Sequence, residues 1–275
     1  MTAPLVSPLP TPLVSVAPSQ ALARLLPIGL EELIEKASLQ ERMDRKYLLP
    51  AIEVDRVLAA VEPQTRVLEI DGIRAFGYES VYFDTPELTS FRLTAYRRAR
   101  RFKVRTRTYV DSASCWLEVK TPGRRGTTIK HRRPYRPDDR STLEPGRAFV
   151  NSVLADIPIP GHQAMPFAPT LITRYRRSTL FLPGTASRVT IDSDLVWEGD
   201  RGRSLSLPGM AIVETKTGST ASRVDRLLWS RGHRPVRISK YATGLAALHP
   251  ELPAGLWRRT LRRHFDDADR RPPFS

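Results

Sequence analysis

Polar and apolar residues alternate with a period of two over much of the chain. In residues 102–110, for example, Val104 and Thr106 alternate with Lys103, Arg105 and Arg107. Because successive side chains of a strand point to opposite faces, this pattern predicts a strand with one charged face. The same pattern, with turn signals between the segments, predicts strands over residues 41–49, 74–83, 102–110, 114–121, 126–133, 170–182, 187–197 and 210–217.

Other segments repeat their apolar residues with the helical period. Pro86 stands where a helix over residues 86–98 can begin, since proline is tolerated at the first helical position. The predicted helices are 29–36, 51–61, 86–98, 144–154, 220–231 and 242–248. Strands that mostly follow one another favour an antiparallel sheet in an α+β fold. A closed antiparallel barrel of about eight strands, with helices packed around it, would leave no exposed edge.

Both ends of the chain differ from this folded region. Prolines interrupt the first residues, at Pro4, Pro8, Pro10, Pro12, Pro18 and Pro27. Such spacing excludes a regular helix or a central strand, so residues 1–28 are expected to be a disordered tail. One domain is expected over residues 29–260, followed by a charged tail over 261–275.

The charge of the chain is strongly positive. Lys and Arg number 44 against 29 Asp and Glu, a formal net charge of +15. This balance indicates a polyanionic partner, which charge alone leaves open among nucleic acid, an anionic membrane surface and a polyphosphorylated molecule. No nucleic-acid-binding motif occurs, and aromatic residues are not expected to be interleaved with the basic strands as stacking platforms, so no specific nucleic acid is expected.

The cysteine, the histidines and the hydropathy of the chain argue against disulfides, a zinc site and membrane-spanning helices. Cys115 is the only cysteine, which excludes an intrachain disulfide, and its apolar neighbours predict a buried thiol. The five histidines have no metal-ligand spacing, which disfavours a zinc site. No apolar run reaches the length of a transmembrane helix, and no signal peptide is recognised, so a cytoplasmic location is expected.

The charged faces of the strands carry the candidate chemistry. Cations dominate these faces, but a carboxylate accompanies them on several strands. Glu118 and Lys120 form a Glu-x-Lys pattern that recurs at Glu214 and Lys216. Taken singly, each face is explained by contact with water. If the faces instead point into a barrel, like charges would repel one another, and anions with a hard metal ion would be needed to balance them.

Seven short motifs in order resemble a known family. They are Asp44-Arg45-Lys46-Tyr47, Tyr82-Phe83-Asp84-Thr85, Arg105-Thr106-Arg107, Glu118-Val119-Lys120, Arg188-Val189-Thr190-Ile191-Asp192, Val213-Glu214-Thr215-Lys216 and Ser239-Lys240-Tyr241. Together they resemble the catalytic domain of the vacuolar transporter chaperone (VTC) polyphosphate polymerases, in the triphosphate tunnel metalloenzyme superfamily. The resemblance covers residues 38–248. It implies a basic tunnel that binds the triphosphate of ATP with Mn²⁺ or Mg²⁺ and adds the γ-phosphate to polyphosphate.

The resemblance also implies roles for individual residues. Lys46, Arg105, Arg107, Lys120 and Lys240 correspond to catalytic cations. Lys130, Tyr175, Arg177, Arg188 and Lys216 correspond to phosphate-binding residues, although Arg174 and Arg176 leave the register of Tyr175 and Arg177 open. Glu214 corresponds to the metal carboxylate, with Asp192 and Glu118 as helpers to the metal or to nearby cations.

One departure separates this chain from the related CYTH branch of triphosphatases and adenylate cyclases. That branch begins with Glu-x-Glu-x-Lys, where this chain has Arg42, Asp44 and Lys46. A cation in place of the first acid favours the VTC branch over a hydrolase with two metals.

Three functions remain open at this stage. The first is polyphosphate synthesis from ATP, and the second is hydrolysis of inorganic or nucleoside triphosphate in the same fold. The third is a non-catalytic module that binds polyphosphate or nucleic acid. The oligomeric state and any membrane partner also stay open.

Overall fold

The computed structural model describes residues 19–36, 43–123, 127–159, 161–266 and 268–271. The strands are β1 (Leu26–Ile28), β2 (Met43–Pro50), β3 (Arg66–Leu68), β4 (Phe76–Asp84), β5 (Lys103–Tyr109), β6 (Ser114–Pro122), β7 (Thr128–Tyr135), β8 (Ala168–Leu182), β9 (Ser187–Glu198), β10 (Ser204–Ser206), β11 (Met210–Thr217) and β12 (Asp269–Arg271). The α-helices are α1 (Gln20–Ala23), α2 (Leu30–Lys36), α3 (Ala51–Leu58), α4 (Thr89–Ala95), α5 (Arg147–Ala155), α6 (Arg223–Ser230), α7 (Lys240–Leu248) and α8 (Arg258–His264). Each strand and helix predicted from the sequence has its counterpart among them.

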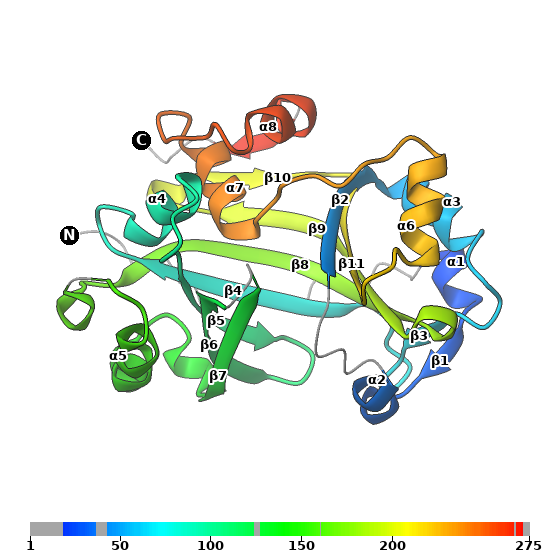
Figure 1. Ribbon diagram of the computed structural model, residues 1–275, viewed down its shortest axis with the longest axis horizontal. Helices are drawn as coiled ribbons and strands as arrows, with labels where there is room; N and C mark the ends of the chain where they lie inside the picture. The colour runs from blue at the N-terminus through cyan, green and yellow to red at the C-terminus, as the bar shows by residue number, and fades with distance from the viewer. Residues whose placement is uncertain (1–18, 37–42, 124–126, 160, 267, 272–275) are drawn as a thin grey trace.

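One large sheet forms the centre of the molecule (Figure 1). Its main run is β7-β6-β5-β4-β8-β9-β11-β2, and every neighbouring pair in this run is antiparallel. The short strands β10 and β12 extend the sheet from β9, and β3 with β1 extends it from β8. The α+β antiparallel class expected from the sequence is therefore confirmed.

The hydrogen bonds do not close this sheet into the expected barrel. The run ends at β7 and β2, and no pairing between these two strands occurs within the described residues. On that open side, the backbone N–H of Val236 donates to the carbonyl of Lys46 at 2.7 Å, and the Lys103 ammonium donates to Ser239 Oγ at 2.9 Å. Residues 236–239 thus connect β2 to β5 across part of the gap, and the sheet with this segment forms a trough.

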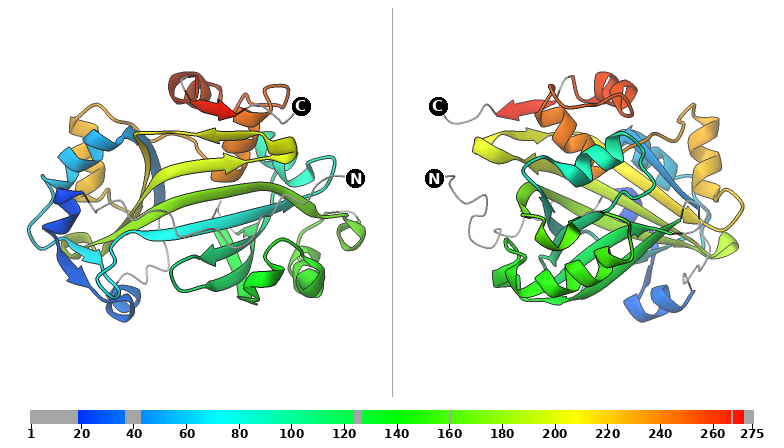
Figure 2. Two further views of the ribbon diagram at one scale, coloured as in Figure 1. Left: turned by 180° about the vertical axis from the view of Figure 1, so that it is seen from behind. Right: turned by 60° about the vertical axis from the view of Figure 1, so that its left-hand side comes forward.

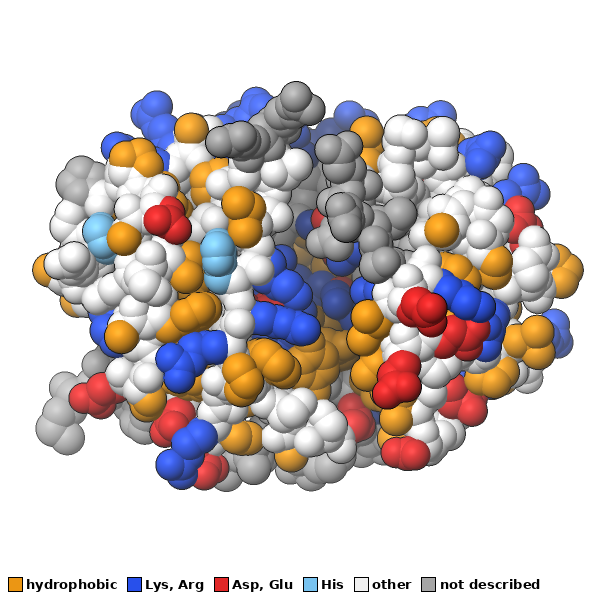
Figure 3. Space-filling model, turned by 60° about the horizontal axis from the view of Figure 1, so that its bottom comes forward, with side chains coloured by type: hydrophobic (Ala, Val, Ile, Leu, Met, Phe, Trp, Pro, Cys, Tyr) orange, Lys and Arg blue, Asp and Glu red, His pale blue; other side chains and the backbone are white. Residues whose placement is uncertain are grey.

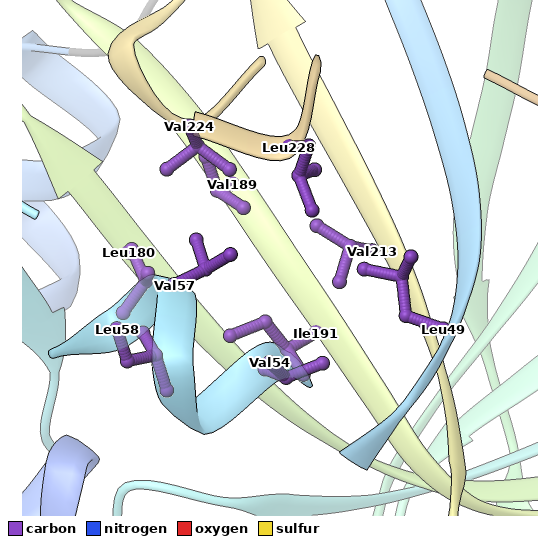
Figure 4. A pocket seen from close by; sticks show the side chains of 10 residues that line it. All are labelled: Leu49, Val54, Val57, Leu58, Leu180, Val189, Ile191, Val213, Val224 and Leu228. Carbon is purple, nitrogen blue, oxygen red and sulfur yellow. The ribbon is translucent and has the colours of Figure 1, made fainter. Parts of the chain in front are cut away.

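The outer face of the sheet is apolar and is covered by helices. Helix α5 packs against β6, with Val150 and Leu154 in one cluster with Val104 and Leu117. Helices α3 and α6 lie side by side at the other end and cover β2, β8, β9 and β11 (Figure 4). The alternation of apolar and charged residues therefore buries one face of the sheet beneath helices, as an outer layer.

Helix α7 packs against the inner face instead. Tyr241 stacks on Tyr82 of β4 with ring centres 5.1 Å apart, and both belong to a cluster with Leu48 and Ile212. Gly244 permits the close approach, because a Cβ there would lie 2.1 Å from Cδ1 of Trp197. The inner face is thus divided into an apolar part beneath α7 and a charged part beyond its N-terminal end.

One expected helix start was wrong, and both expected tails contain strands. Helix α4 begins at Thr89 rather than at Pro86, and its N–H groups at Ser90 and Phe91 donate to the buried Asp84 carboxylate. Parts of both expected tails belong to the fold, since β1 pairs with β3 and β12 with β10 (Figure 2). Residues 1–18 and 272–275 lie outside the described residues. Within the described part of the chain, no helix is both long enough and apolar enough to span a membrane.

Candidate functional site

Strand register brings the predicted cations onto one face. Arg105 lies between Tyr82 of β4 and Glu118 of β6, and Lys120 lies between Lys103 and Lys130. On the far side of the trough, Glu214 pairs with Lys46, and Lys216 with Arg188. Figure 3 shows Lys and Arg side chains gathered in a hollow of the molecule. The inward direction of these faces, which no single strand could decide, follows from the helices that cover the opposite face.

Arg105, Glu118 and Lys130 form the first charged group. Arg105 Nε donates to Glu118 Oε2 at 2.8 Å, and Arg105 Nη1 donates to the Tyr82 hydroxyl at 3.1 Å. Lys130 Nζ lies 3.8 Å from the other carboxylate oxygen of Glu118, a side chain only 1% exposed. Burial alone would raise the pKa of Glu118, but the charges of Arg105, Arg107 and Lys130 hold it well below its usual range. Glu118 is therefore ionised, and it orients Arg105.

Asp192, Arg177 and Lys240 form the second group. Arg177 donates to the two oxygens of Asp192 through Nε and Nη2, at 2.6 and 2.8 Å. Lys240, the first residue of α7, donates to the same carboxylate. Burial acts to raise the pKa of Asp192, but Arg177 and Lys240 together lower it to about 2. Bidentate pairing of this kind fixes the direction of the guanidinium.

Glu214 lies between two lysines in the third group. Its Oε1 is 3.4 Å from Lys216 Nζ and 3.9 Å from Lys46 Nζ, both longer than an ordinary N–H···O hydrogen bond. Burial would raise its pKa, but Lys46 and Lys216 hold that pKa well below the usual range. Glu214 is therefore an ionised carboxylate without the arginine partner that Glu118 and Asp192 each have.

Three further cations lack an acidic partner. Within the described residues, no carboxylate lies within 4.0 Å of Lys103, Lys120 or Arg107. Arg107 instead donates to the Tyr175 hydroxyl at 3.1 Å. Burial, together with the charges of Lys46 and Arg105, lowers the pKa of Lys103 to about 7. Burial and neighbouring cations also lower the pKa of Lys120 well below its usual range. The trough therefore carries an excess of positive charge that its own carboxylates do not balance.

The register left open at Tyr175 and Arg177 is settled by the contacts. Tyr175 and Arg177 face the trough, where Lys240 Nζ lies 4.3 Å from the centre of the Tyr175 ring. Arg174 points to the opposite face and donates through Nε to Glu79 at 2.8 Å, and Arg176 donates to the carbonyl of Ala75. Tyr175 and Arg177 are therefore the residues of this motif that face the trough, and Arg174 faces away from it.

Comparison with known proteins identifies the family. The model of the VTC domain matches residues 41–249, which include all seven motifs and the three charged groups. The chain belongs to the VTC domain family. No curated protein matches it in sequence.

Solved structures of low sequence identity resemble this VTC domain. One is a candidate adenylate cyclase from Bacillus halodurans, with 14% identity and a TM-score of 0.48 over 74% of this chain and 96% of that chain. Another is a candidate adenylyl cyclase from Hippeastrum with a dominant triphosphatase activity, with 15% identity and a TM-score of 0.45 over 74% and 94% of the two chains. Because both TM-scores are below 0.5, nothing further is inferred from these similarities.

The carboxylates of the VTC domain do not form a preassembled metal site. In the described part of the chain, no three His, Cys, Asp or Glu side chains come together as metal ligands. Asp192 and Glu118 were expected to help the metal or nearby cations, and in this arrangement both contact cations, Glu118 through Oε2. Among the carboxylates of the three charged groups, Glu214 has no ion pair with an arginine within the described residues, and a single carboxylate of this kind suits a Mg²⁺ ion completed by substrate phosphates and water. Arg42, where the CYTH branch has an acid, lies outside the described residues.

The sequence reasoning missed two features of the site. Lys103 was placed on the charged face but was not proposed as a site residue, although its position opposite Lys120 follows from the strand register. Aromatic residues were judged not to be interleaved with the cations, and this was wrong. Tyr78, Tyr82 and Tyr175 face the trough, and the guanidinium carbon of Arg177 lies 5.1 and 5.4 Å from two of these rings. The alternation of side chains along β4, which places Tyr78 and Tyr82 on one face, could have predicted this.

Proposed function

We propose that this VTC domain binds the triphosphate of a nucleotide in the trough and transfers its terminal phosphoryl group to a phosphate chain, so that polyphosphate grows. Family membership supports a function in triphosphate or phosphoryl-transfer chemistry. The observation that carries the proposal is the set of cations without acidic partners, Arg107, Lys103 and Lys120, beside three charged groups in one trough. Such an excess of positive charge on half-buried side chains is balanced by a polyanion.

The transfer requires positioning and charge stabilisation rather than a covalent nucleophile. An oxygen of the terminal phosphate of the acceptor attacks the γ-phosphorus, and the bond from that phosphorus to the bridging oxygen breaks. The leaving group is the nucleoside diphosphate, and the product chain is longer by one phosphate. Arg105 and Arg177 are held by Glu118 and Asp192, so they present donors in fixed directions to charge that develops on the phosphoryl oxygens.

Glu214 is the residue of the chain that would hold a divalent ion together with the phosphates. Such an ion, when bound, supplies neutralisation of charge on the transferred group. Lys46 and Lys216 lie on either side of Glu214, so they would contact the same phosphates. Mn²⁺ and Mg²⁺ both suit an oxygen donor set of this kind.

The test separates three outcomes. Purified protein is incubated with ATP and either Mn²⁺ or Mg²⁺, and the phosphate products are separated on a gel. Long chains together with ADP support the proposal. Free phosphate with no chains would instead establish a triphosphatase, and the absence of turnover despite binding of inorganic triphosphate would establish a binding module. The Arg107→Met variant is the matched comparison: it removes a phosphate-binding cation that has no acidic partner within the described residues, so it should weaken triphosphate binding without disturbing the fold.

A further inference from the structure

An aromatic ring and a guanidinium stack at one margin of the trough. Trp116 of β6 shares the inner face with Glu118 and Lys120, and it lies directly opposite Arg107 of β5. The guanidinium carbon of Arg132 on β7 is 4.6 Å from the centre of its ring. Trp116 is half-buried and Arg132 is exposed. This pair lies beside the phosphate-binding cations, but the proposed phosphoryl transfer gives it no role.

The packing of β6 does not require a tryptophan at this position. Its neighbours Cys115 and Leu117 point to the outer face, where Leu117 is buried in the cluster beneath α5. Trp116 points away from that core and has the flat cation of Arg132 against its ring. A large aromatic side chain that is partly open to solvent and stacked by an exposed guanidinium has the geometry in which a nucleobase binds.

We propose that Trp116, with Arg132, forms a subsite that stacks the base of a nucleoside triphosphate whose phosphates lie in the trough. The subsite rests on the proposed function and specifies its donor. Stacking uses the face of the base rather than its hydrogen-bonding edge, so the subsite accepts ATP and GTP alike. It distinguishes both from inorganic triphosphate, which has no base to stack.

The spacing along the strands suits one nucleotide. Residues two apart on a strand are separated by roughly 6.5–7 Å. Trp116 is thus one such step from Glu118, where Arg105 is bonded, and Arg132 is one step from Lys130. A nucleotide with its base on Trp116 would therefore place its phosphates toward Arg105, Arg107 and Lys130.

The other candidate for a base site is a cavity of about 310 Å³ beside β2. It is lined by Lys46, by residues 235–239 and by Leu256 and Trp257. Its only tryptophan offers no open face, because Trp257 is 2% exposed and packs on Phe91 with ring centres 6.0 Å apart. The cavity can admit a phosphate chain past Lys46, but it lacks the flat surface that stacking requires.

The experiment compares ATP with inorganic triphosphate in the full chain by calorimetry without metal. Replacement of Trp116 by Leu should weaken ATP binding about tenfold, within the range measured for stacking of one base, and should leave triphosphate binding within about twofold. Replacement of Trp116 by Phe should retain most of the ATP affinity. ATP should also quench the tryptophan fluorescence of the parent protein but not that of the Trp116→Phe variant. The Trp229→Phe variant should still be quenched, since Trp229 bonds Tyr47 outside the trough.

The outcomes separate this inference from the proposed function. Equal losses for ATP and triphosphate in the Trp116→Leu variant, or no loss for either, would overturn the base subsite while triphosphate binding by the parent protein still supports the trough. Failure of the parent protein to bind either ligand would overturn both. Quenching that survives in Trp116→Phe would place the base elsewhere and refute the subsite.

Discussion

Replacement of Glu214 by Gln tests the proposed metal ligand, which, unlike Glu118 and Asp192, has no ion pair with an arginine within the described residues. The change keeps the size of the side chain and removes its charge. Metal-dependent turnover should fall by at least about a hundredfold, because Glu214 is the carboxylate proposed to hold the divalent ion. Binding of metal-free triphosphate should survive the change and become tighter.

The magnitude of the tightening follows from the two lysines. Glu214 lies 3.4 Å from Lys216 and 3.9 Å from Lys46, and Coulomb's law at an effective dielectric constant of about 20 gives roughly 4–5 kcal/mol for each contact. Glutamine forfeits this attraction, so both ammonium groups become available to phosphate. If about 1.4 kcal/mol of the attraction that the lysines had for Glu214 is regained with phosphate, triphosphate binds tenfold more tightly.

The matched controls are Asp192→Asn and Glu118→Gln. Each removes charge from a carboxylate that is 1% exposed and bonded to an arginine, and breaking such a buried pair costs about 3–5 kcal/mol. Their melting temperatures should fall by roughly 6–20 °C. Glu214→Gln should lower the melting temperature by less, because its contacts to Lys46 and Lys216 are longer than hydrogen bonds and the released ammonium groups can turn to water. Calorimetric titration, scanning calorimetry and the gel assay measure the three quantities. Wild-type turnover in Glu214→Gln, or weaker triphosphate binding by it, would refute the assignment.

Four other variants test the site and the fold. The pKa of Lys103 is about 7, and only the protonated amine attracts phosphate, so triphosphate affinity should decrease above pH 7 by up to tenfold per pH unit. Calorimetry on Lys103→Met should show a smaller dependence of affinity on pH. An unchanged dependence would exclude Lys103 as its source. Arg107→Met should weaken triphosphate binding with little change in melting temperature. Arg105→Met should lower both the affinity and the melting temperature, because it leaves Glu118 buried beside a single lysine. Equal melting temperatures of the two variants would contradict the stabilising pairing of Arg105 with Glu118. Gly244→Ala should reduce the free energy of unfolding by about 1–3 kcal/mol in urea titration, since the new methyl group would overlap Trp197, and unchanged stability would show that α7 can shift.

The strands could be predicted from the sequence because alternation is a local property. Residues two apart must share a face, so the grouping of Lys103, Arg105 and Arg107 required no knowledge of the neighbouring strands. Tyr175 and Arg177 were grouped on one face for the same reason, although Arg174 and Arg176 left that register open. The acid partners of Arg174, Glu79 and Glu198, lie on other strands and are distant in sequence.

Closure and carboxylate roles could not be predicted, because they depend on contacts between distant segments. Hydrogen bonds that would close the barrel require β7 and β2 to meet, and alternation says nothing about which strands become neighbours. The same motif, Glu-x-Lys, also has two outcomes in this chain. Glu118 is bonded to Arg105, whereas Glu214 has only lysines beside it, and the difference arises from the residue that the neighbouring strand places opposite each acid.

This difference bears on the proposed function, in which a single trough holds its cations and also binds a metal with phosphate. An acid paired with an arginine fixes that arginine, because the bidentate contact leaves the guanidinium one orientation and keeps the acid ionised. An acid between two lysines fixes neither, because a lysine is a flexible point charge that can turn to a phosphate. Glu118 and Asp192 therefore contribute rigidity to the site, whereas Glu214 contributes a negative charge that the lysines can leave when substrate enters. Exchange of the partners, by replacing Lys46 with Arg, should convert Glu214 from the second kind of acid to the first. It should reduce metal-dependent turnover more than triphosphate binding, and equal losses of both would show that the identity of the cation beside Glu214 does not matter.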